Sequence, residues 1–238
     1  MRDADIDPLD RPPASRRADD RARPGRSGKA DLKTTILRVA TEEFARRGFK
    51  GVRIERIASR AECSVRMLYK YHGDKRAIYL RVLEQAYAEL RRHDLKITEN
   101  AEPLRAIEEL IEGTFDYMQR NREFALLTRN ENLLEGRFIS LSRRSAASAA
   151  ALIRSLRRIL RDGERSGAFR SGIDALQLYV SIVALSVHHI VNEHTLSTVF
   201  GERLGHDAWI AARRRHVREL VLGGILTDQS RARKGPLA

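Results

Sequence analysis

The chain has 238 residues, of which 42% are hydrophobic and 32% charged, proportions typical of a soluble globular protein with a highly charged surface. Its formal net charge is +13, and such an excess attracts polyanions such as nucleic acids or an acidic membrane surface. An arginine-rich surface that serves only solubility would give the same charge. The single cysteine, Cys63, excludes an intrachain disulfide and a cysteine-based metal cluster and fits a reducing cytoplasm.

The sequence gives no sign of export or membrane insertion. The first residues, MRDADIDPLDRPP, contain no apolar stretch that would act as a signal peptide. The most apolar run, residues 173–191, is nearly long enough to span a membrane but contains Asp174, Gln177, His188 and His189. We therefore expect a buried helix in a cytoplasmic protein, with no membrane partner.

The N-terminal segment, residues 1–29, is rich in Arg, Asp and Pro and almost lacks large apolar side chains. Such a segment buries too little surface to order itself, so we expect a disordered basic arm. Its basic run consists of Arg16, Arg17, Arg21, Arg23, Arg26 and Lys29. The arm either lies along DNA phosphates or in a minor groove, or serves only as a solubilising tail.

Helical periodicity begins directly after this arm. Apolar residues recur at helical spacing up to a glycine stop at Gly48. A short second helix around Ile57 leads into a tight turn at Glu62, and Ser64 caps a third short helix over residues 65–71. The pattern thus predicts one longer helix followed by two short ones.

The remaining sequence also predicts helices. Asp74 caps a long fourth helix, and Pro103 opens the next one at its first turn. Apolar periodicity predicts further helices over residues 122–134, 138–165, 173–198 and 206–226.

Residues 53–75, RIERIASRAECSVRMLYKYHGDK, have the pattern of a helix-turn-helix. The second short helix carries apolar residues that seat it on the first, and its other face carries Ser64, Arg66, Met67 and Lys70. Because a helix fits the DNA major groove and arginine pairs with guanine, this face is a candidate for reading bases. Tyr69, Tyr71 and Lys75 are placed to contact phosphates.

The same region resembles the TetR family of bacterial regulators. The matching segments are FARRGF, IERIASRAECS and LYKYHGDKRAIYLRVL, which lie within residues 30–85. The resemblance implies a homodimer whose C-terminal helices bind a small effector and thereby reposition the DNA-reading helices. By family position it implies these DNA contacts: Arg53, Ser64, Arg66, Met67, Tyr69, Lys70, Tyr71 and Lys75. For Met67 the alternative to a DNA contact is a role in packing alone.

The predicted fold class is all-α, with an N-terminal three-helix helix-turn-helix DNA-binding domain followed by a helical bundle for ligand binding and dimerisation. The expected boundaries are 1–29 for the arm, 30–74 for the DNA-binding domain, 75–227 for the helical domain and 228–238 for a flexible tail. The helices over 173–198 and 206–226 are expected to form the dimer seam as a four-helix bundle.

Three residues depart from the family pattern. Glu62 stands in the turn where glycine is usual, and a left-handed backbone there would cost glutamate about 1 kcal/mol or more. His72 replaces a usual phenylalanine, so it either loosens the packing between the third and fourth helices or contacts phosphate. Arg66 replaces a small residue and suggests an altered base preference.

The resemblance also implies an effector pocket among the fourth to eighth helices. The expected apolar walls are Leu83, Tyr87, Phe115, Met118, Phe124 and Leu127. In the segment RNENLLEGR, one of Asn130, Glu131 and Asn132 is a candidate for orienting a polar ligand, with a solvated or capping role as the alternative.

Other sites receive less support from the sequence. His188, His189 and His194 are poorly spaced on a helix for one metal ion, so we expect no metal and no cofactor, and place these histidines on the helix surface or at the dimer seam. Cys63 is either a redox sensor in the DNA-binding turn or a small buried apolar side chain.

The sequence predicts a ligand-responsive, DNA-binding transcriptional regulator that a small-molecule effector releases from its operator. No catalytic triad, carboxylate pair or phosphate-binding glycine loop is present in convincing form, so we expect no enzymatic activity. Two alternatives remain: a transcriptional activator on the same frame, and an architectural protein that binds DNA without regard to sequence.

Overall fold

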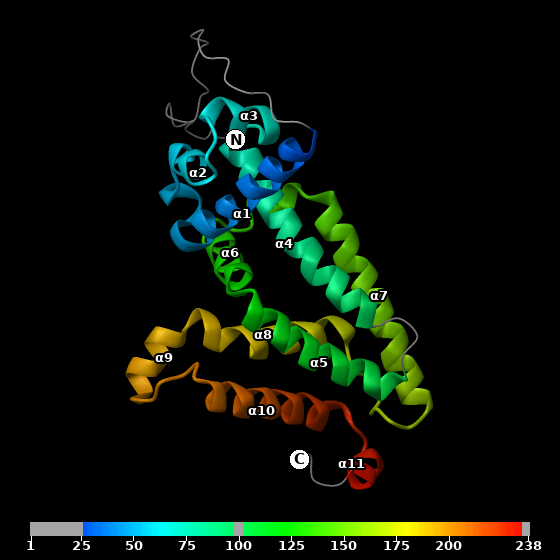
Figure 1. Cartoon of the computed structure of the whole chain (residues 1–238). Coiled ribbons are helices and arrows are strands. Elements are labelled where there is room, and N and C mark those ends of the chain that lie inside the picture. Colours follow the sequence, from blue (N-terminus) through cyan, green and yellow to red (C-terminus); the bar gives the residue numbers. More distant parts are fainter. Residues whose placement is uncertain (1–25, 98–101, 235–238) are drawn as a thin grey trace, which may run out of the picture. The chain divides into compact units, whose positions relative to one another are not determined.

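The computed structural model describes residues 26–97 and 102–234, so most of the predicted N-terminal arm lies outside the described residues. Within those ranges the protein is built from helices and turns, with one isolated antiparallel bridge between Phe169 and Leu226 (Figure 1). The all-α prediction is confirmed. The chain divides into two compact units, the first comprising Met1–Gln85 and Asn130–Ser142 and the second Ala86–Arg129 and Arg143–Ala238.

The first unit contains α1 (Arg26–Gly51), α2 (Ile54–Arg60), α3 (Val65–His72) and the first part of α4 (Lys75–Ile97). Helix α1 begins four residues before the predicted boundary at residue 30, and Gly48, with φ 66°, interrupts its helical backbone where a stop was predicted. Helices α1, α2 and α3 pack against one another around Ile57 and Leu68. The predicted three-helix arrangement is thus present.

The first unit also includes residues 130–142, which the sequence did not assign to it. Phe138 is buried there, with its ring centroid 4.6 Å from that of Phe49 and 5.0 Å from that of Tyr79. The chain reaches this position through two left-handed residues, Glu135 and Gly136. A single helix over 138–165 was therefore wrong: a short 3₁₀ turn, η2 (Ile139–Leu141), precedes α7 (Arg143–Arg165).

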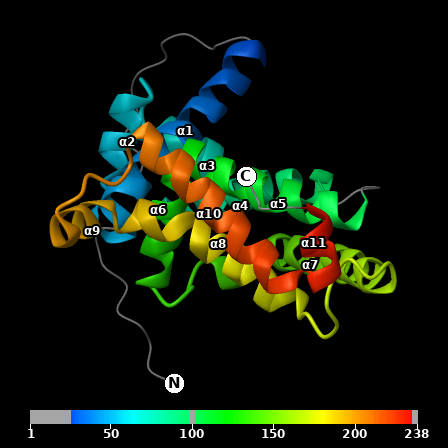
Figure 2. The ribbon, with the colours of Figure 1, turned by 90° about the horizontal axis from the view of Figure 1, so that it is seen from below.

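The second unit is built around α5 (Pro103–Arg120), α7, α8 (Ala175–Val191) and α10 (Asp207–Ile225). The last part of α4 and most of α6 (Arg122–Asn132) also belong to it. Helices α5, α8 and α10 pack directly on one another (Figure 1 and Figure 2), and α7 covers α5 and α8. Its largest core cluster includes Ile107, Leu156, Ile182 and Val217.

The predicted helix over 173–198 is in fact two helices, α8 and α9 (Glu193–Phe200), which meet at a bend of 72°. The Asn192 side chain donates to the carbonyl of His188 at 2.9 Å, and this side-chain bond accompanies the end of α8. Within the described ranges no single helix is long and apolar enough to cross a membrane, although α8 and α9 together meet that criterion as a bent pair.

The predicted flexible tail from residue 228 is also corrected, because α11 (Asp228–Lys234) occupies its first part. The Thr227 hydroxyl accepts from the backbone N–H of Ser230 and donates to the carbonyl of Gly167. These bonds begin the helix and attach it to the turn after α7. The tail therefore has partners that its polar composition did not indicate.

Gly163 provides a test of packing in the second unit. It is buried on α7, and a Cβ at this position would overlap the ring of Phe169. We expect Gly163→Ala to lower the free energy of unfolding by about 1–3 kcal/mol, measured by urea denaturation, because the close-packed ring must move. In the double variant with Phe169→Ala, the alanine at 163 should cost clearly less, and equal costs in both backgrounds would contradict this packing.

Candidate DNA-binding surface and ligand-binding region

The turn between α2 and α3 is closed by backbone hydrogen bonds. The Glu62 N–H donates to the Ser59 carbonyl at 3.2 Å, and the Cys63 N–H donates to the Ala58 carbonyl at 3.0 Å. This is the pattern of a Schellman helix end, in which the residue after the cap takes the left-handed conformation and is usually glycine. Glu62 has φ 52°, so the strain expected from its departure from the family pattern is present.

Helix α3 has a buried face and an exposed face. The Ser64 side chain caps it by accepting from the Met67 N–H at 3.2 Å. Leu68 is fully buried, while Arg66 and Lys70 are exposed. The two basic side chains that the sequence analysis placed on a DNA-reading face therefore extend into solvent from a helix that is seated by its other side.

The other expected DNA contacts surround α3. Arg53 is exposed and directly precedes α2. Tyr71 is half-buried, with the Lys33 ammonium 5.5 Å from its ring centroid, and the Lys75 ammonium lies 4.8 Å from the ring centroid of Phe49. Met67 and Tyr69 are half-buried as well. The surface around α3 is thus rich in cations, and Lys33 adds one that the sequence analysis did not identify.

A buried carboxylate on α1 positions α2. Glu43 is only 1% exposed and accepts from Arg56 Nε and from Arg60 Nη1, each at 2.8 Å. Burial alone raises the pKa of Glu43, but the hydrogen bonds from the two guanidinium groups outweigh it and leave the pKa below its ordinary value. This role of Glu43 was not predicted, although Glu43 follows Ile36 by two helical turns on the apolar face of the predicted helix.

The structure bears on the alternative roles of His72 and Cys63 in the first unit. His72 is only 2% exposed and its pKa is lowered, first by burial and then by the nearby Arg81 guanidinium. It therefore packs in the core, and the alternative of a phosphate contact is not supported. Burial raises the pKa of the half-buried Cys63 thiol, which opposes the thiolate that a redox sensor needs.

The expected pocket residues are divided between the two units. Tyr87, Met118 and Phe124 lie in one apolar cluster of the second unit, with the Tyr87 and Phe124 ring centroids 5.3 Å apart. Phe115 belongs to the larger core of that unit, and Leu127 is buried. Leu83, Asn130 and Asn132 are in the first unit.

Asn130 and Glu131 bind backbone groups of the first unit. The Asn130 side-chain amide donates to the carbonyls of Phe44 and Ala45, both at 3.0 Å. Glu131 accepts from the backbone N–H groups of Phe138 and Ile139 at 2.7 and 2.9 Å. Asn130 thus attaches its segment to α1, and Glu131 holds residues 138 and 139. Both side chains bind backbone groups, which agrees with a capping role and not with orienting a ligand. Asn132 is exposed.

The core of the second unit contains a buried polar network between α4 and α8. Asp94 Oδ2 accepts from Arg91 Nη1 at 2.9 Å and from the Tyr179 hydroxyl at 2.7 Å. Burial raises the pKa of Asp94 above its ordinary value, although the contacts with Tyr179 and Arg91 oppose this change. Such a network fixes the two helices in one relative position, because an unpaired buried charge is costly.

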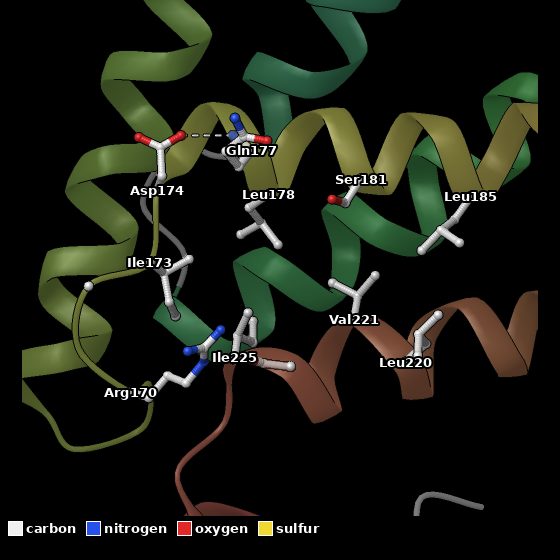
Figure 3. A pocket seen from close by; sticks show the side chains of 12 residues that line it. Arg170, Ile173, Asp174, Gln177, Leu178, Ser181, Leu185, Leu220, Val221 and Ile225 are labelled. Atoms are coloured by element: carbon white, nitrogen blue, oxygen red, sulfur yellow. Dashed lines mark hydrogen bonds between the residues drawn. The ribbon is translucent and has the colours of Figure 1, made fainter.

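A cavity of about 380 Å³ lies between α8 and α10 (Figure 3). Its apolar walls come from Leu178 and Leu185 on one helix and from Leu220, Val221 and Ile225 on the other. Its polar lining consists of Arg170, Asp174, Gln177 and Ser181. The sequence predicted a dimer seam at these two helices and gave no sign of a cavity between them.

The histidines of this region lie in different environments. His188 is exposed on α8, His194 is exposed on α9, and His189 is buried in the core. Burial of His189 corrects the expectation of a surface or seam position. In the part of the chain that the structure describes, no three His, Cys, Asp or Glu side chains are grouped so that they could hold a metal ion.

The sequence matches two family models that together cover most of both units. "Bacterial regulatory proteins, tetR family" matches residues 36–82, and "Tetracyclin repressor-like, C-terminal domain" matches residues 103–221. The chain belongs to the TetR family. The resemblance found in the sequence is thereby confirmed, and the chain is a DNA-binding transcriptional regulator.

This TetR-family regulator is similar to known proteins along most of its length. It is 32% identical to the HTH-type transcriptional repressor NicS of Pseudomonas putida over 84% of this chain and 95% of that protein. It is 30% identical to the HTH-type transcriptional repressor SCO4008 of Streptomyces coelicolor, over 65% of this chain and 76% of that one.

Solved structures show the same fold. Transcriptional regulator SCO4942 of Streptomyces coelicolor superposes with a TM-score of 0.63 at 22% identity, over 82% of this chain and 98% of that one. The ketosteroid transcriptional regulator KstR2 of Mycobacterium tuberculosis also gives a TM-score of 0.63, at 19% identity, over 86% of this chain and 98% of that one.

The strained turn before α3 gives a stability prediction. We expect Glu62→Gly to raise the free energy of unfolding by about 1 kcal/mol, since glycine adopts the left-handed backbone without a Cβ clash. Urea denaturation measures the change. Glu55→Gly is the matched control, because Glu55 is exposed within α2 and glycine there should lower stability by about 1 kcal/mol. A loss of stability in both variants would show that Glu62 is not strained.

Proposed function

We propose that this protein is a homodimeric repressor that binds an operator through α3 and leaves it when a small-molecule effector binds the second unit. The observation that carries the proposal is that α3 has one buried face and one exposed face. Leu68 is fully buried, whereas Arg66 and Lys70 are exposed. A helix seated in this way presents its outer face to a major groove. The names of the two similar repressors support the sign of regulation. Such a regulator acts on DNA in the cytoplasm.

Dimerisation is expected through α8 and α10. Leu176 and Val180 on α8 and Leu220 on α10 are all at least half exposed, which is unusual for large apolar side chains. Near the end of α10, Gly223 and Gly224 have no neighbouring heavy atom within 4 Å of where a Cβ would lie. Each glycine costs a helix about 1 kcal/mol, so a closely packed partner helix would explain why two glycines stand near this end of α10. A twofold pairing here would set the spacing of two α3 helices.

The route from effector to operator follows two helices that belong to both units. Helices α4 and α6 each begin in one unit and end in the other. The end of α6 is attached to α1 by the Asn130 bonds to the Phe44 and Ala45 carbonyls. A ligand that prefers one arrangement of α4 and α6 would therefore change the position of α3, and a coupling of about 1–3 kcal/mol is enough to switch occupancy.

Base reading by Arg66 gives the first test. The operator is obtained by selecting bound duplexes from a random pool, and affinities are measured by fluorescence anisotropy. We expect Arg66→Ala to lose about 1–3 kcal/mol of preference at one base pair in each half-site, because its guanidinium can pair with guanine. Arg154→Ala, which removes an exposed arginine from α7, is the control and should leave affinity and preference unchanged.

The architectural alternative predicts another result. If Arg66→Ala weakened binding to every sequence equally, with no change of preference at any position, the protein would be holding DNA by charge alone. A transcriptional activator with the same fold would show the same loss of base preference in Arg66→Ala. Transcription in vitro from a promoter that carries the selected site distinguishes an activator from a repressor.

The exposed apolar face gives the second test. We expect the double variant Val180→Glu and Leu220→Glu to be monomeric by size exclusion with light scattering, because paired helices would bury these charges without partners. Operator binding should be lost at concentrations that saturate the wild type. Leu133→Glu is the control, since Leu133 is 74% exposed in the first unit. A dimeric double variant would refute this seam.

A further inference from the structure

His189 lies in an aromatic and polar cluster where α5, α8 and α10 meet in the second unit. It is only 4% exposed. Its ring stacks on Phe115, with centroids 5.5 Å apart and planes 16° from parallel, and lies 5.3 Å from the ring centroid of Trp209. The amide nitrogen of Gln119 is 2.5 Å from His189 Nε2. Three helices therefore hold this imidazole in one orientation.

The other ring nitrogen of His189 is buried and has no hydrogen-bond partner. Burial, followed by the nearby Arg213 guanidinium, lowers the pKa of His189 to about 4, so the ring is neutral near pH 7. In the tautomer that accepts from the Gln119 amide at Nε2, the ring proton is on Nδ1. A buried N–H without an acceptor is unfavourable, so an acceptor on a bound ligand would stabilise it.

Arg213 on α10 is a second unsatisfied donor near this histidine. It is half-buried and donates to the Leu185 carbonyl at 3.2 Å. Its Nε is buried without a hydrogen-bond partner, as are the Nε atoms of Arg214 and Arg218, so what distinguishes Arg213 from them is its carboxylate pairing and not its Nε. No ion pair joins it to a carboxylate within the described ranges, whereas its neighbours Arg214 and Arg218 pair with Asp116 and Glu108. Burial lowers the pKa of Arg213, which is the mark of a cation that lacks a counter-charge.

We propose that His189 and Arg213 bind the carboxylate of a small effector, with the apolar body of that molecule against Trp209. A carboxylate accepts hydrogen bonds only, so it complements a neutral imidazole N–H and a guanidinium. Trp209 is half-buried and supplies an aromatic surface one helical turn before Arg213. This inference rests on the proposed function, because it assigns a chemical class to the effector of the same regulator.

The single tryptophan of the chain makes the site directly observable, since Trp209 fluorescence reports binding beside it. The full-length protein is titrated with acetate, hexanoate and benzoate, and with acetamide, hexanamide and benzamide as neutral counterparts of similar shape. We expect at least one carboxylate to change the fluorescence saturably and to bind about tenfold or more tightly than its amide. If no carboxylate binds more tightly than its amide, the proposal is overturned.

Two variants locate the binding. Arg213→Gln keeps a polar side chain without the charge, and His189→Phe keeps a stacked ring without the N–H. Each should weaken carboxylate binding by about tenfold or more and leave amide binding nearly unchanged. Arg203→Gln, an exposed arginine in the same unit, is the control and should bind carboxylate like the wild type. Unchanged carboxylate affinity in Arg213→Gln would place the anion elsewhere and overturn the assignment.

Operator affinity is then measured with and without the preferred carboxylate. Release of the operator by the wild type, but not by Arg213→Gln, supports the site and the proposed function together. Carboxylate binding that depends on Arg213 but leaves operator affinity unchanged would keep the anion site and reject its role as the effector site. Operator binding with no carboxylate preference would keep the DNA-binding function and reject the anion site.

Discussion

The surface proposed to read DNA depends on tertiary packing, because α2 and α3 are only seven and eight residues long. Helices this short do not persist alone in water, so they exist here by burying apolar side chains against α1. Burial of apolar side chains, Ile57 and Leu68 among them, contributes to the driving force. The Glu43 carboxylate, which binds Arg56 and Arg60, adds a directional constraint that apolar contacts lack. Exposure of Arg66 and Lys70 follows from that seating.

The second unit also buries polar groups in its core. Asp94 is paired with Arg91 and Tyr179, and this pairing ties α4 to α8. His189 and Arg213 keep buried nitrogens without hydrogen-bond partners, and Asp94 keeps its Oδ1 without one, but Arg213 also has no carboxylate partner among the described residues. Paired groups define one structure, whereas unpaired groups leave free energy that a ligand can recover on binding. Under the proposed function, Asp94 stabilises the fold, whereas His189 and Arg213 bind the ligand.

Segment 130–142 shows where local sequence reasoning fails. The sequence left open whether one of Asn130, Glu131 and Asn132 orients a polar ligand or has a solvated or capping role, and it predicted a helix starting at Phe138. In the structure Phe138 packs with Phe49 and Tyr79, and the amide of Asn130 binds two backbone carbonyls of α1. Neither partner is near in sequence, and no periodicity records them. The gain from burying an aromatic ring outweighs the preference of the following residues for helix.

The left-handed turn at Glu62 was expected only through the resemblance to the TetR family, and the structure shows it. The sequence by itself determined the all-α class, the helix-turn-helix and the basic outer face of α3. These features follow from spacing, capping and charge, which act over a few residues. Only the tertiary structure decided that α8 ends at Asn192, that His72 and His189 are buried, and that Glu43 holds α2. The reason is physical: burial and buried hydrogen bonds depend on which distant segments meet, and a periodic pattern shows that a face is covered without showing by what.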